Sequence, residues 1–348
     1  TILIYLNNEY FMIRSNNEWE RLREVVVGTA ENANNPRLEK DLHCINYADI
    51  DDVKIQRGYY PKVVVEETQE DLYIFQQSLE DLDIKVKRVI PQNNNKNYSN
   101  PFWETDGYYN YCPRDSVTVI GDTIIESPMT LRARQHETYG FREMFIEEMK
   151  NGARWVSAPK PMLKDESYQR DDLSKLTLNN VEPIFDAANI LRANNDILYL
   201  LSNTGNELGA IWLQNFLGSE YKVHIIRDVY SYIHIDSTIA LLREGLCLLN
   251  PERVNEDNMP EFLKSWDKIW CPPCKDIGYY GDYNHASTWV GLNLLSLDER
   301  TVVVDRKQDK LVEQLSKHGI MSIPMRLRHA RTLGGSFHCV TTDMWREN

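Results

Sequence analysis

Six polar side chains in this sequence could together carry out chemistry on a cationic substrate. They are three carboxylates, one histidine, one serine and one thiol: Asp115, Asp186, His234, Asp236, Ser287 and Cys339. A thiolate attacks electrophilic carbon, a histidine transfers protons, and a carboxylate can orient that histidine. Two carboxylates can hold a planar guanidinium, whose five N–H donors match their oxygens. These residue types predict attack by Cys339 on a guanidinium carbon.

Cys339 lies in the sequence LGGSFHCVT at residues 333–341. Glycines in such a segment allow a tight turn or a close approach of the backbone to another group. A cysteine in an apolar segment is most often a buried small hydrophobe, so the prediction of a nucleophile depends on its partners. Neighbours on an extended chain face opposite ways, which indicates a structural role for His338.

His234 and Asp236 alternate with isoleucines over residues 233–236. In an extended segment, residues two apart share a face, so both polar side chains would point the same way. The same alternation is also typical of a half-buried strand with a solvated polar face. The catalytic interpretation is favoured only in combination with Cys339 and two further carboxylates.

The elements that would position these side chains recur along the chain. Hydrophobic patterns predict a strand–strand–helix–strand unit four times, with hairpins beginning near residues 117, 189, 238 and 292. The third unit is expected to have its helix at residues 259–266. Residues 24–90 fit a looser fifth copy, in which Thr68 and Asp71 predict the start of a helix. We therefore expect an α/β fold of about five modules, forming a single domain over residues 1–348.

The candidate residues occupy comparable places in this repeat. Asp115, Asp186, residues 234–236 and Ser287 each stand just before a predicted hairpin, and Cys339 follows the last predicted strand. If the modules surround an axis, these side chains meet there. Scattered surface polarity would not follow the repeat.

Composition disfavours several classes of protein. A formal charge of −13 and a pI near 5.2 are unsuited to nucleic-acid binding. No apolar run approaches the ~20 residues that a membrane span needs, and residues 1–6 lack the features of a signal peptide. Six cysteines in 348 residues do not indicate a disulfide framework. We expect a cytoplasmic protein with reduced thiols.

Residues 270–275 read WCPPCK and contain a Cys-x-x-Cys motif. A thioredoxin-type centre needs a helix after its first cysteine, and the residues that follow here lack a helical period. A zinc site would need two more ligands at metal-like spacing. The sequence therefore favours neither a metal nor a redox role for this motif. Arg114 is expected to pair with nearby acids rather than with substrate.

Several motifs resemble the glycine (arginine) amidinotransferase family of guanidine-modifying enzymes. In chain order they are PRD at 113–115, ESPM at 126–129, FDAA at 185–188, HID at 234–236, NPER at 250–253 and GGSFHC at 334–339. The resemblance runs from Trp19 to Met344. It is greatest for the bacterial branch that amidinates amines in secondary metabolism, including the cyanobacterial enzyme of the saxitoxin pathway. It implies a five-module ββαβ propeller of the pentein type with a central active site and no cofactor.

The resemblance also implies a role for each site residue. Cys339 would take the amidino group from L-arginine, release ornithine and pass the group to an acceptor amine in a ping-pong reaction. His234 would act as general acid and base, with Asp186 as its partner. The implied substrate contacts are Asp115 and Asp236 for the guanidinium, Arg253 for the carboxylate of the donor, and Ser287.

Three positions depart from the members of the family that use glycine. Ala286 stands where those enzymes have a second serine, and Ser231 and Ile233 replace an asparagine and a methionine. These positions shape the acceptor pocket, so the resemblance implies an acceptor amine larger than glycine. By analogy with dimeric relatives, a homodimer is a further expectation.

Four alternatives stay open at this point. The acceptor could be glycine itself, or water could attack the intermediate, as in a hydrolase of the arginine deiminase type. A non-catalytic guanidinium-binding protein would need only the carboxylates, so the presence of Cys339, His234 and Asp186 disfavours it. A cysteine protease would use similar residue types, but three converging acids fit a cation better than a peptide carbonyl.

Overall fold

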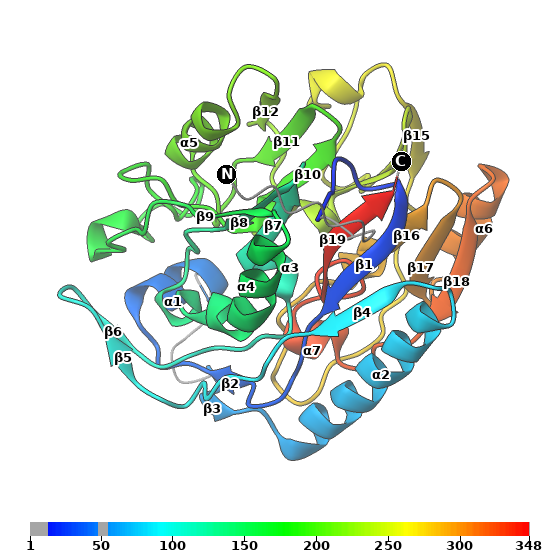
Figure 1. The fold of residues 1–348 in the computed structure, drawn as a ribbon. Helices are drawn as coiled ribbons and strands as arrows, with labels where there is room; N and C mark the ends of the chain where they lie inside the picture. Colours follow the sequence, from blue (N-terminus) through cyan, green and yellow to red (C-terminus); the bar gives the residue numbers. More distant parts are fainter. Residues whose placement is uncertain (1–12, 48–54, 348) are drawn as a thin grey trace, which may run out of the picture.

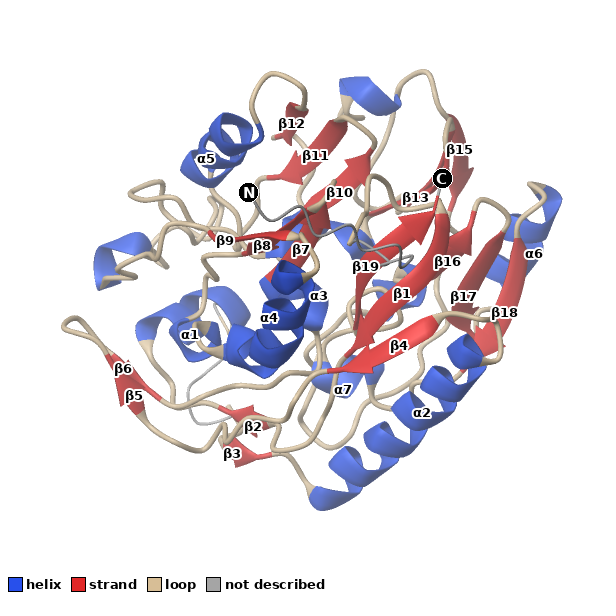
Figure 2. Ribbon diagram, viewed as in Figure 1, coloured by secondary structure: helices blue, strands red, loops and turns tan. Residues whose placement is uncertain are grey.

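The computed structural model describes residues 13–47 and 55–347, so the N-terminal residues 1–6 considered above lie outside the described part. Five three-stranded sheets dominate it, and all five share one topology (Figures 1 and 2). In each sheet the first two strands are antiparallel and the third runs parallel to the second. The three strands of the predicted strand–strand–helix–strand repeat are therefore confirmed in all five modules, and an α-helix precedes the last strand in each module except the third.

Four modules follow one another along the chain. The first comprises β7 (Val117–Ile120), β8 (Thr123–Glu126), α4 (Arg142–Lys150) and β9 (Arg154–Ser157). The second comprises β10 (Ile190–Ala193), β11 (Asp196–Leu200), α5 (Glu207–Leu217) and β12 (Lys222–Ile226). The third comprises β13 (Ile239–Arg243), β14 (Leu246–Leu249), the 3₁₀ turn η7 (Glu261–Leu263) and β15 (Asp267–Trp270). The fourth comprises β16 (Leu295–Asp298), β17 (Thr301–Asp305), α6 (Asp309–Lys317) and β18 (Met321–Met325).

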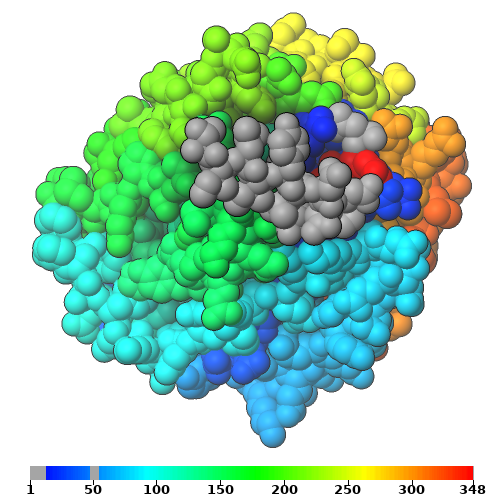
Figure 3. Space-filling view, in the orientation of Figure 1, coloured from blue at the N-terminus to red at the C-terminus, as the bar shows by residue number. Residues whose placement is uncertain are grey.

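The fifth module joins the two ends of the chain. Its strands are β19 (Thr341–Glu347), β1 (Arg21–Val27) and β4 (Lys85–Arg88), with α2 (Lys62–Glu80) before β4. β19 pairs antiparallel with β1, so the last strand supplies the first strand of the module that begins the chain. Figure 3 shows the red C-terminal atoms at the surface beside dark-blue N-terminal atoms. The sequence repeat did not reveal this exchange, because the two strands lie more than 300 residues apart.

Shorter elements connect the modules. They are β2 (Asn34–Asn35), α1 (Lys40–Asn46), β3 (Gly58–Tyr59), β5 (Tyr98–Ser99), β6 (Glu104–Thr105), η2 (Arg132–Arg134), η3 (Glu137–Phe141) and η4 (Asp165–Ser167). No helix in the described ranges is long and apolar enough to cross a membrane.

Two helix predictions were wrong in detail. α2 begins at Lys62, after Pro61, and Thr68 lies inside it, where its hydroxyl donates to the carbonyl of Val64 at 2.6 Å. The valines at 63–65 resemble a strand, but Val64 continues the buried face of the helix that includes Leu72. The helix expected at 259–266 is only the turn η7, because Pro260 and the strand that starts at Asp267 leave room for little more.

Hydrophobic clusters join each sheet to the next. One cluster is shared by the first and second modules, one by the second and third, and one by the third and fourth. A further cluster joins the fourth module to the fifth, and another joins the fifth to the first. The five sheets remain separate, and none of those described closes on itself through hydrogen bonds.

A short helical turn precedes the first strand of each of the four consecutive modules. These turns are α3 (Pro113–Ser116), η5 (Ala187–Asn189), η6 (Ile235–Ser237) and η8 (Thr288–Leu292). α3 packs against η5, η5 against η6 and η6 against η8, and α7 (Ala330–Leu333) also packs against η8. The starts of the modules therefore meet in one region, as the repeat predicted.

A buried group of charges lies among the strands that begin the modules. Asp343 of β19 is fully buried and accepts from Arg192 at 2.6 Å, Arg114 at 2.7 Å and Arg346 at 2.8 Å. Glu18 binds Arg192 through both carboxylate oxygens at 2.9 Å. Arg114 thus pairs with acids, as expected. Burial disfavours the carboxylate of Asp343, but the three arginines hold its pKa well below the usual range.

We predict that Asp343→Asn will lower the free energy of unfolding at neutral pH by about 3–5 kcal/mol, because it leaves buried guanidinium groups without their carboxylate. A carboxyl whose pKa is depressed on folding stabilises the protein above its unfolded pKa, about 3.9, and loses this effect as the pH falls further. The difference from the wild type should therefore shrink below about pH 4. Urea unfolding at several pH values measures both effects. Asp257→Asn, at an exposed position, is the control, and a difference that is small or independent of pH would contradict the prediction.

Candidate active site

All ten site residues predicted from the sequence line one cavity of about 560 Å³. They are Asp115, Asp186, Ser231, Ile233, His234, Asp236, Arg253, Ala286, Ser287 and Cys339. Most of them come from the segments that precede successive modules, and Arg253 follows β14 within the third module. This arrangement explains why residues more than 200 positions apart meet. The volume is typical of a small-molecule site.

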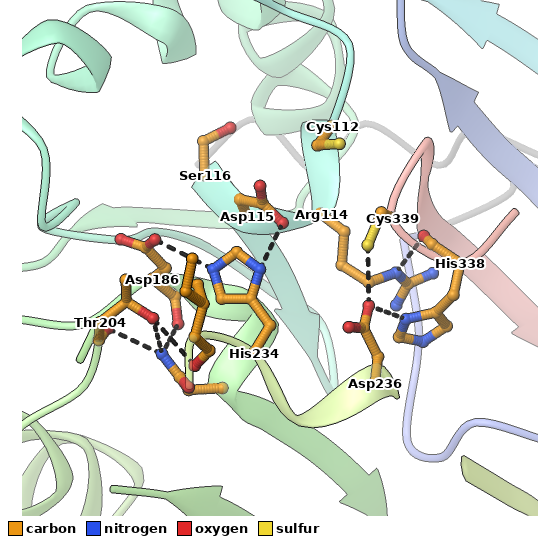
Figure 4. Close-up of polar contacts among 12 residues, drawn as sticks. Cys112, Arg114, Asp115, Ser116, Asp186, Thr204, His234, Asp236, His338 and Cys339 are labelled. Atoms are coloured by element: carbon orange, nitrogen blue, oxygen red, sulfur yellow. Dashed lines mark hydrogen bonds and ion pairs between the residues drawn. The ribbon is translucent and has the colours of Figure 1, made fainter. Parts of the chain in front are cut away.

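Cys339 and its neighbour His338 both contact the carboxylate of Asp236 (Figure 4). The Cys339 sulfur lies 3.2 Å from Oδ2 of Asp236, and Nδ1 of His338 lies 2.8 Å from the same oxygen. The prediction that His338 faces away was wrong, because residues 337–340 form a turn rather than an extended segment. The other ring nitrogen of His338 lies 3.4 Å from Glu18, which connects the site to the buried charges described above.

Asn293, at the end of η8, fixes the position of Cys339. Its Oδ1 accepts from the backbone N–H of Cys339 at 3.1 Å and of Ser336 at 3.2 Å. Its Nδ2 lies 3.2 Å from the Cys339 sulfur and 3.3 Å from the carbonyl of Asp236. No feature of the sequence indicated this residue, because its role depends on contacts across the fold.

The two glycines before Cys339 have the uses that the sequence suggested. Gly334 ends α7 with φ of +87°, in the left-handed region. Gly335 permits a close approach, since a Cβ there would lie 2.6 Å from both the Cys112 sulfur and the Cβ of Cys339. The turn that presents Cys339 therefore requires glycine at both positions.

His234 lies between two carboxylates (Figure 4). Its Nε2 is 3.1 Å from Oδ2 of Asp186, and its Nδ1 is 3.5 Å from Oδ1 of Asp115. Burial disfavours the charged ring, but Asp115, Asp186 and Asp236 outweigh it and raise the pKa of His234 to about 9. His234 is thus an imidazolium at neutral pH. The segment is not extended as expected, because η6 begins directly after His234 and brings Asp236 into the cavity by a turn.

Whereas His234 is held in its charged form, the thiol of Cys339 is held in its neutral form. Contact with the Cys112 sulfur, burial, and the nearby charge of Asp236 raise its pKa well above the usual value. Burial by itself would raise the pKa of Asp236. The hydrogen bond and charge of His338, together with the charge of His234, outweigh burial and lower this pKa to about 2. In the absence of a bound cation, the site therefore combines a neutral thiol with an anionic carboxylate.

Asp115 has a partner that the sequence did not reveal. Arg134 of η2 binds its Oδ2 at 2.7 Å and holds Glu137 through both oxygens at 2.8 Å. Oδ1 of Asp115 is buried without a hydrogen-bond partner and lies on the side of His234. Asp115 therefore directs one oxygen to Arg134 and the other toward the ring of His234.

Arg253 is held by hydroxyl groups rather than by a carboxylate. Its Nη1 donates to Thr238 at 2.8 Å, Ser237 at 2.9 Å and Ser231 at 3.1 Å. Ser231 also donates to the backbone carbonyl of His234 at 2.5 Å, so its hydroxyl is engaged in the cavity wall. No carboxylate of the described residues lies within 4.0 Å of the Arg253 guanidinium, whose positive charge is therefore available to an anionic group.

A search of the described residues finds no group of three or more His, Cys, Asp or Glu side chains that could hold a metal ion. The loop that follows β15 brings the sulfurs of Cys271 and Cys274 to 3.8 Å from each other, outside the cavity.

Comparison with known proteins gives close relatives over nearly the whole chain. No family model matches. Inosamine-phosphate amidinotransferase 1 of Streptomyces glaucescens is 48% identical, over 96% of this chain and 97% of that protein. L-arginine:L-lysine amidinotransferase of Pseudomonas savastanoi pv. phaseolicola is 35% identical, over 94% of this chain and 93% of that protein.

Solved structures agree with these relatives. The inosamine-phosphate amidinotransferase of Streptomyces griseus superposes with a TM-score of 0.95 at 46% identity, covering 97% of both chains. The amidinotransferase of the saxitoxin pathway from Microseira wollei gives 0.88 at 35% identity, over 97% of this chain and 98% of that one. DDAH from Pseudomonas aeruginosa, at 12% identity and a TM-score of 0.58 over 92% of this chain and 99% of that one, shares the mixed α/β fold of the pentein type. The chain belongs to the amidinotransferase family of transferases.

Proposed function

We propose that this protein transfers the amidino group of L-arginine to an amine larger than glycine, through a covalent amidino-cysteine at Cys339. One observation carries this proposal: a single cavity contains a buried cysteine, an imidazolium and three carboxylates. Three acids around one nucleophile suit a cationic electrophile. The name of the 35% identical relative includes L-arginine, which supports arginine as the donor.

In the proposed first half-reaction, the guanidinium of arginine binds between Asp115 and Asp236, and its α-carboxylate binds Arg253. The positive charge of the bound guanidinium lowers the pKa of the nearby thiol, so Cys339 loses its proton to solvent. The thiolate attacks the central carbon, with Asn293 donating toward the sulfur. The imidazolium of His234 then protonates the departing nitrogen, ornithine leaves, and the amidino group remains on sulfur.

In the proposed second half-reaction, the acceptor amine attacks the same carbon. His234, now neutral, takes a proton from the attacking amine, and the Cys339 thiolate leaves. Asp186 orients the ring and stabilises its charged form at 3.1 Å. We further propose that the five modules form the propeller expected from the sequence. Each module shares a hydrophobic cluster with the next, and the fifth also shares one with the first.

The acceptor we propose is a phosphorylated aminocyclitol, the class that the name inosamine phosphate describes in the 48% identical relative. Once ornithine has left, the guanidinium of Arg253 is again available, and it suits a phosphate bidentately. Ala286 and Ile233 leave apolar space on the cavity wall. Ser231 and Ser287 complete that side, with Ser231 acting through Arg253 and the backbone of His234.

We predict that brief incubation with L-arginine alone will add one amidino group to Cys339 and release free ornithine. Intact-protein mass spectrometry with peptide mapping measures the adduct. Cys339→Ala should abolish it, while Cys247→Ala, in β14, should label like the wild type. An adduct that retains the ornithine skeleton, with ammonia released, would instead indicate a deiminase. The absence of any adduct or product would reject arginine as the donor.

We predict that labelling of Cys339 by arginine will slow as the pH rises through about 9, the pKa of His234, because only the imidazolium protonates the leaving nitrogen. Asp186→Asn removes a carboxylate that stabilises the charged ring, so this alkaline limb should move down by roughly 1–3 pH units. NMR titration of the His234 ring checks the assignment directly. If the fall in labelling rate occurs at the same pH in Asp186→Asn as in the wild type, the titrating group is not His234.

We predict that an aminocyclitol phosphate will be a better acceptor than glycine, measured as kcat/KM with arginine saturating. Arg253→Gln should raise the KM for the phosphorylated acceptor by about tenfold to a hundredfold, because it removes a charged hydrogen-bonding partner. Arg227→Gln, an exposed arginine paired with Glu207, should behave like the wild type. An unchanged KM for the phosphorylated acceptor in Arg253→Gln, or an equal rise in Arg227→Gln, would contradict the role of Arg253.

A further inference from the structure

Cys271 and Cys274 form a close pair of thiols outside the cavity. Their sulfurs are 3.8 Å apart, and the two residues are separated only by Pro272 and Pro273. Cys271 is buried, whereas Cys274 is partly exposed to solvent. Neither thiol has a place in the proposed reaction, and no metal-binding group of three or more ligands is found around them in the described part of the chain.

This pair lies at the start of a segment that runs into the cavity. Residues 271–287 leave β15 and end at Ser287, and the last of them, His285, Ala286 and Ser287, line the cavity. The segment is fastened near the cysteines by Gln308, which bonds both the N–H and the carbonyl of Lys275, at 2.8 and 2.9 Å. Further along, Arg331 binds Asp276 at 2.6 Å and the carbonyl of Ala286 at 2.8 Å.

Cys274 also touches the helical turn that holds the nucleophile in position. A Cβ placed on Gly291, in η8, would lie only 3.0 Å from the sulfur of Cys274. η8 begins after Ser287 and is followed directly by Asn293, which binds the backbone and sulfur of Cys339. Cys274 therefore packs directly against the turn that lies between two groups of the cavity wall, Ser287 and Asn293.

We infer that the Cys271–Cys274 pair is a redox-modification site, at which disulfide formation by a low-molecular-weight disulfide lowers the activity of the cavity. Bringing the sulfurs from 3.8 Å to bonding distance, about 2.05 Å, moves at least one of them. The sulfur of Cys274 lies against Gly291 of η8, and Cys271 shares a hydrophobic cluster with Trp289 and Leu292 of the same turn. This inference goes beyond amidinotransfer, and only its activity measurement rests on the proposed function.

The chemical steps follow from the exposure of the two thiols. The more accessible Cys274, as thiolate, attacks one sulfur of the small disulfide, forming a mixed disulfide and releasing one small thiolate. Cys271 then loses its proton to solvent and attacks the sulfur of Cys274, and the second small thiolate leaves. The protein gives up two electrons and two protons, and the small disulfide is reduced to two thiols. The hydrogen bond between the pair raises the pKa of Cys271, which agrees with its part as the second thiol to react.

The test uses the reduced full chain and oxidised glutathione. Trypsin releases both cysteines in one peptide, residues 269–275, which contains no other cysteine. We expect this peptide to lose two hydrogens and to resist alkylation. The rate of Cys339 labelling by arginine should fall by about two- to thirtyfold and recover with dithiothreitol.

Variants separate this site from the other thiols. Cys274→Ser should keep its labelling rate in the presence of oxidised glutathione, and Cys271→Ser should accumulate one glutathione on Cys274. Cys247→Ala should respond like the wild type. A peptide that keeps both thiols free, a disulfide that leaves the labelling rate unchanged, or equal inhibition of Cys274→Ser would each overturn the inference. If the reduced protein does not react with arginine at all, the proposed function fails, and the peptide still reports whether the disulfide forms.

Discussion

The carboxylate of Asp343, buried among three arginines, is the interaction on which the rest of the structure depends. Arg114 comes from α3, Arg192 from β10 and Arg346 from β19 itself, so this one acid joins three modules. A buried guanidinium without a carboxylate is costly, and the network is therefore stable only when all three elements are in place. The modules are therefore held together by this buried charge network as well as by apolar packing between their sheets.

The same network extends to the nucleophile. Glu18 binds Arg192 and lies 3.4 Å from His338, which holds Asp236, and Asp236 contacts Cys339. The position of Asp236 is thus set by charges that lie outside the cavity. This explains how a site made from turns, each only a few residues long, can be held rigidly enough for chemistry.

Electrostatics in the cavity favour a cationic ligand. The carboxylates raise the pKa of His234. The contact with Cys112, burial and the charge of Asp236 together raise the pKa of Cys339 and keep its thiol protonated while no cation is present. In the proposed reaction, the substrate itself supplies the positive charge that releases the thiolate. Such a site activates its nucleophile only when a guanidinium is bound, which would limit side reactions of an otherwise reactive cysteine.

The sequence by itself determined the repeated module and six of the residues that line the cavity, because both depend on local patterns. Four more (Ser231, Ile233, Arg253 and Ala286) were indicated only by the resemblance to the amidinotransferase family. Hydrophobic periodicity reports strands and helices, and residues placed alike in each repeat meet when the modules pack together. The limits of this approach appear at Thr68, which lies inside α2 rather than at its start, and at residues 259–266, where Pro260 and the following strand leave only a turn.

Only the tertiary structure decided the contacts that tune the site. The pairing of β19 with β1, Arg134 on Asp115, Asn293 on Cys339 and the 3.8 Å approach of Cys271 to Cys274 were not predicted. The turn that brings His338 and Cys339 to one oxygen of Asp236 was also missed. Most of these contacts join residues far apart in the chain, and all depend on how turns and modules pack. The order of residue types along the chain does not give the distances between residues that meet only after folding. The type of chemistry could therefore be inferred from the sequence, whereas the geometry that controls it required the tertiary structure.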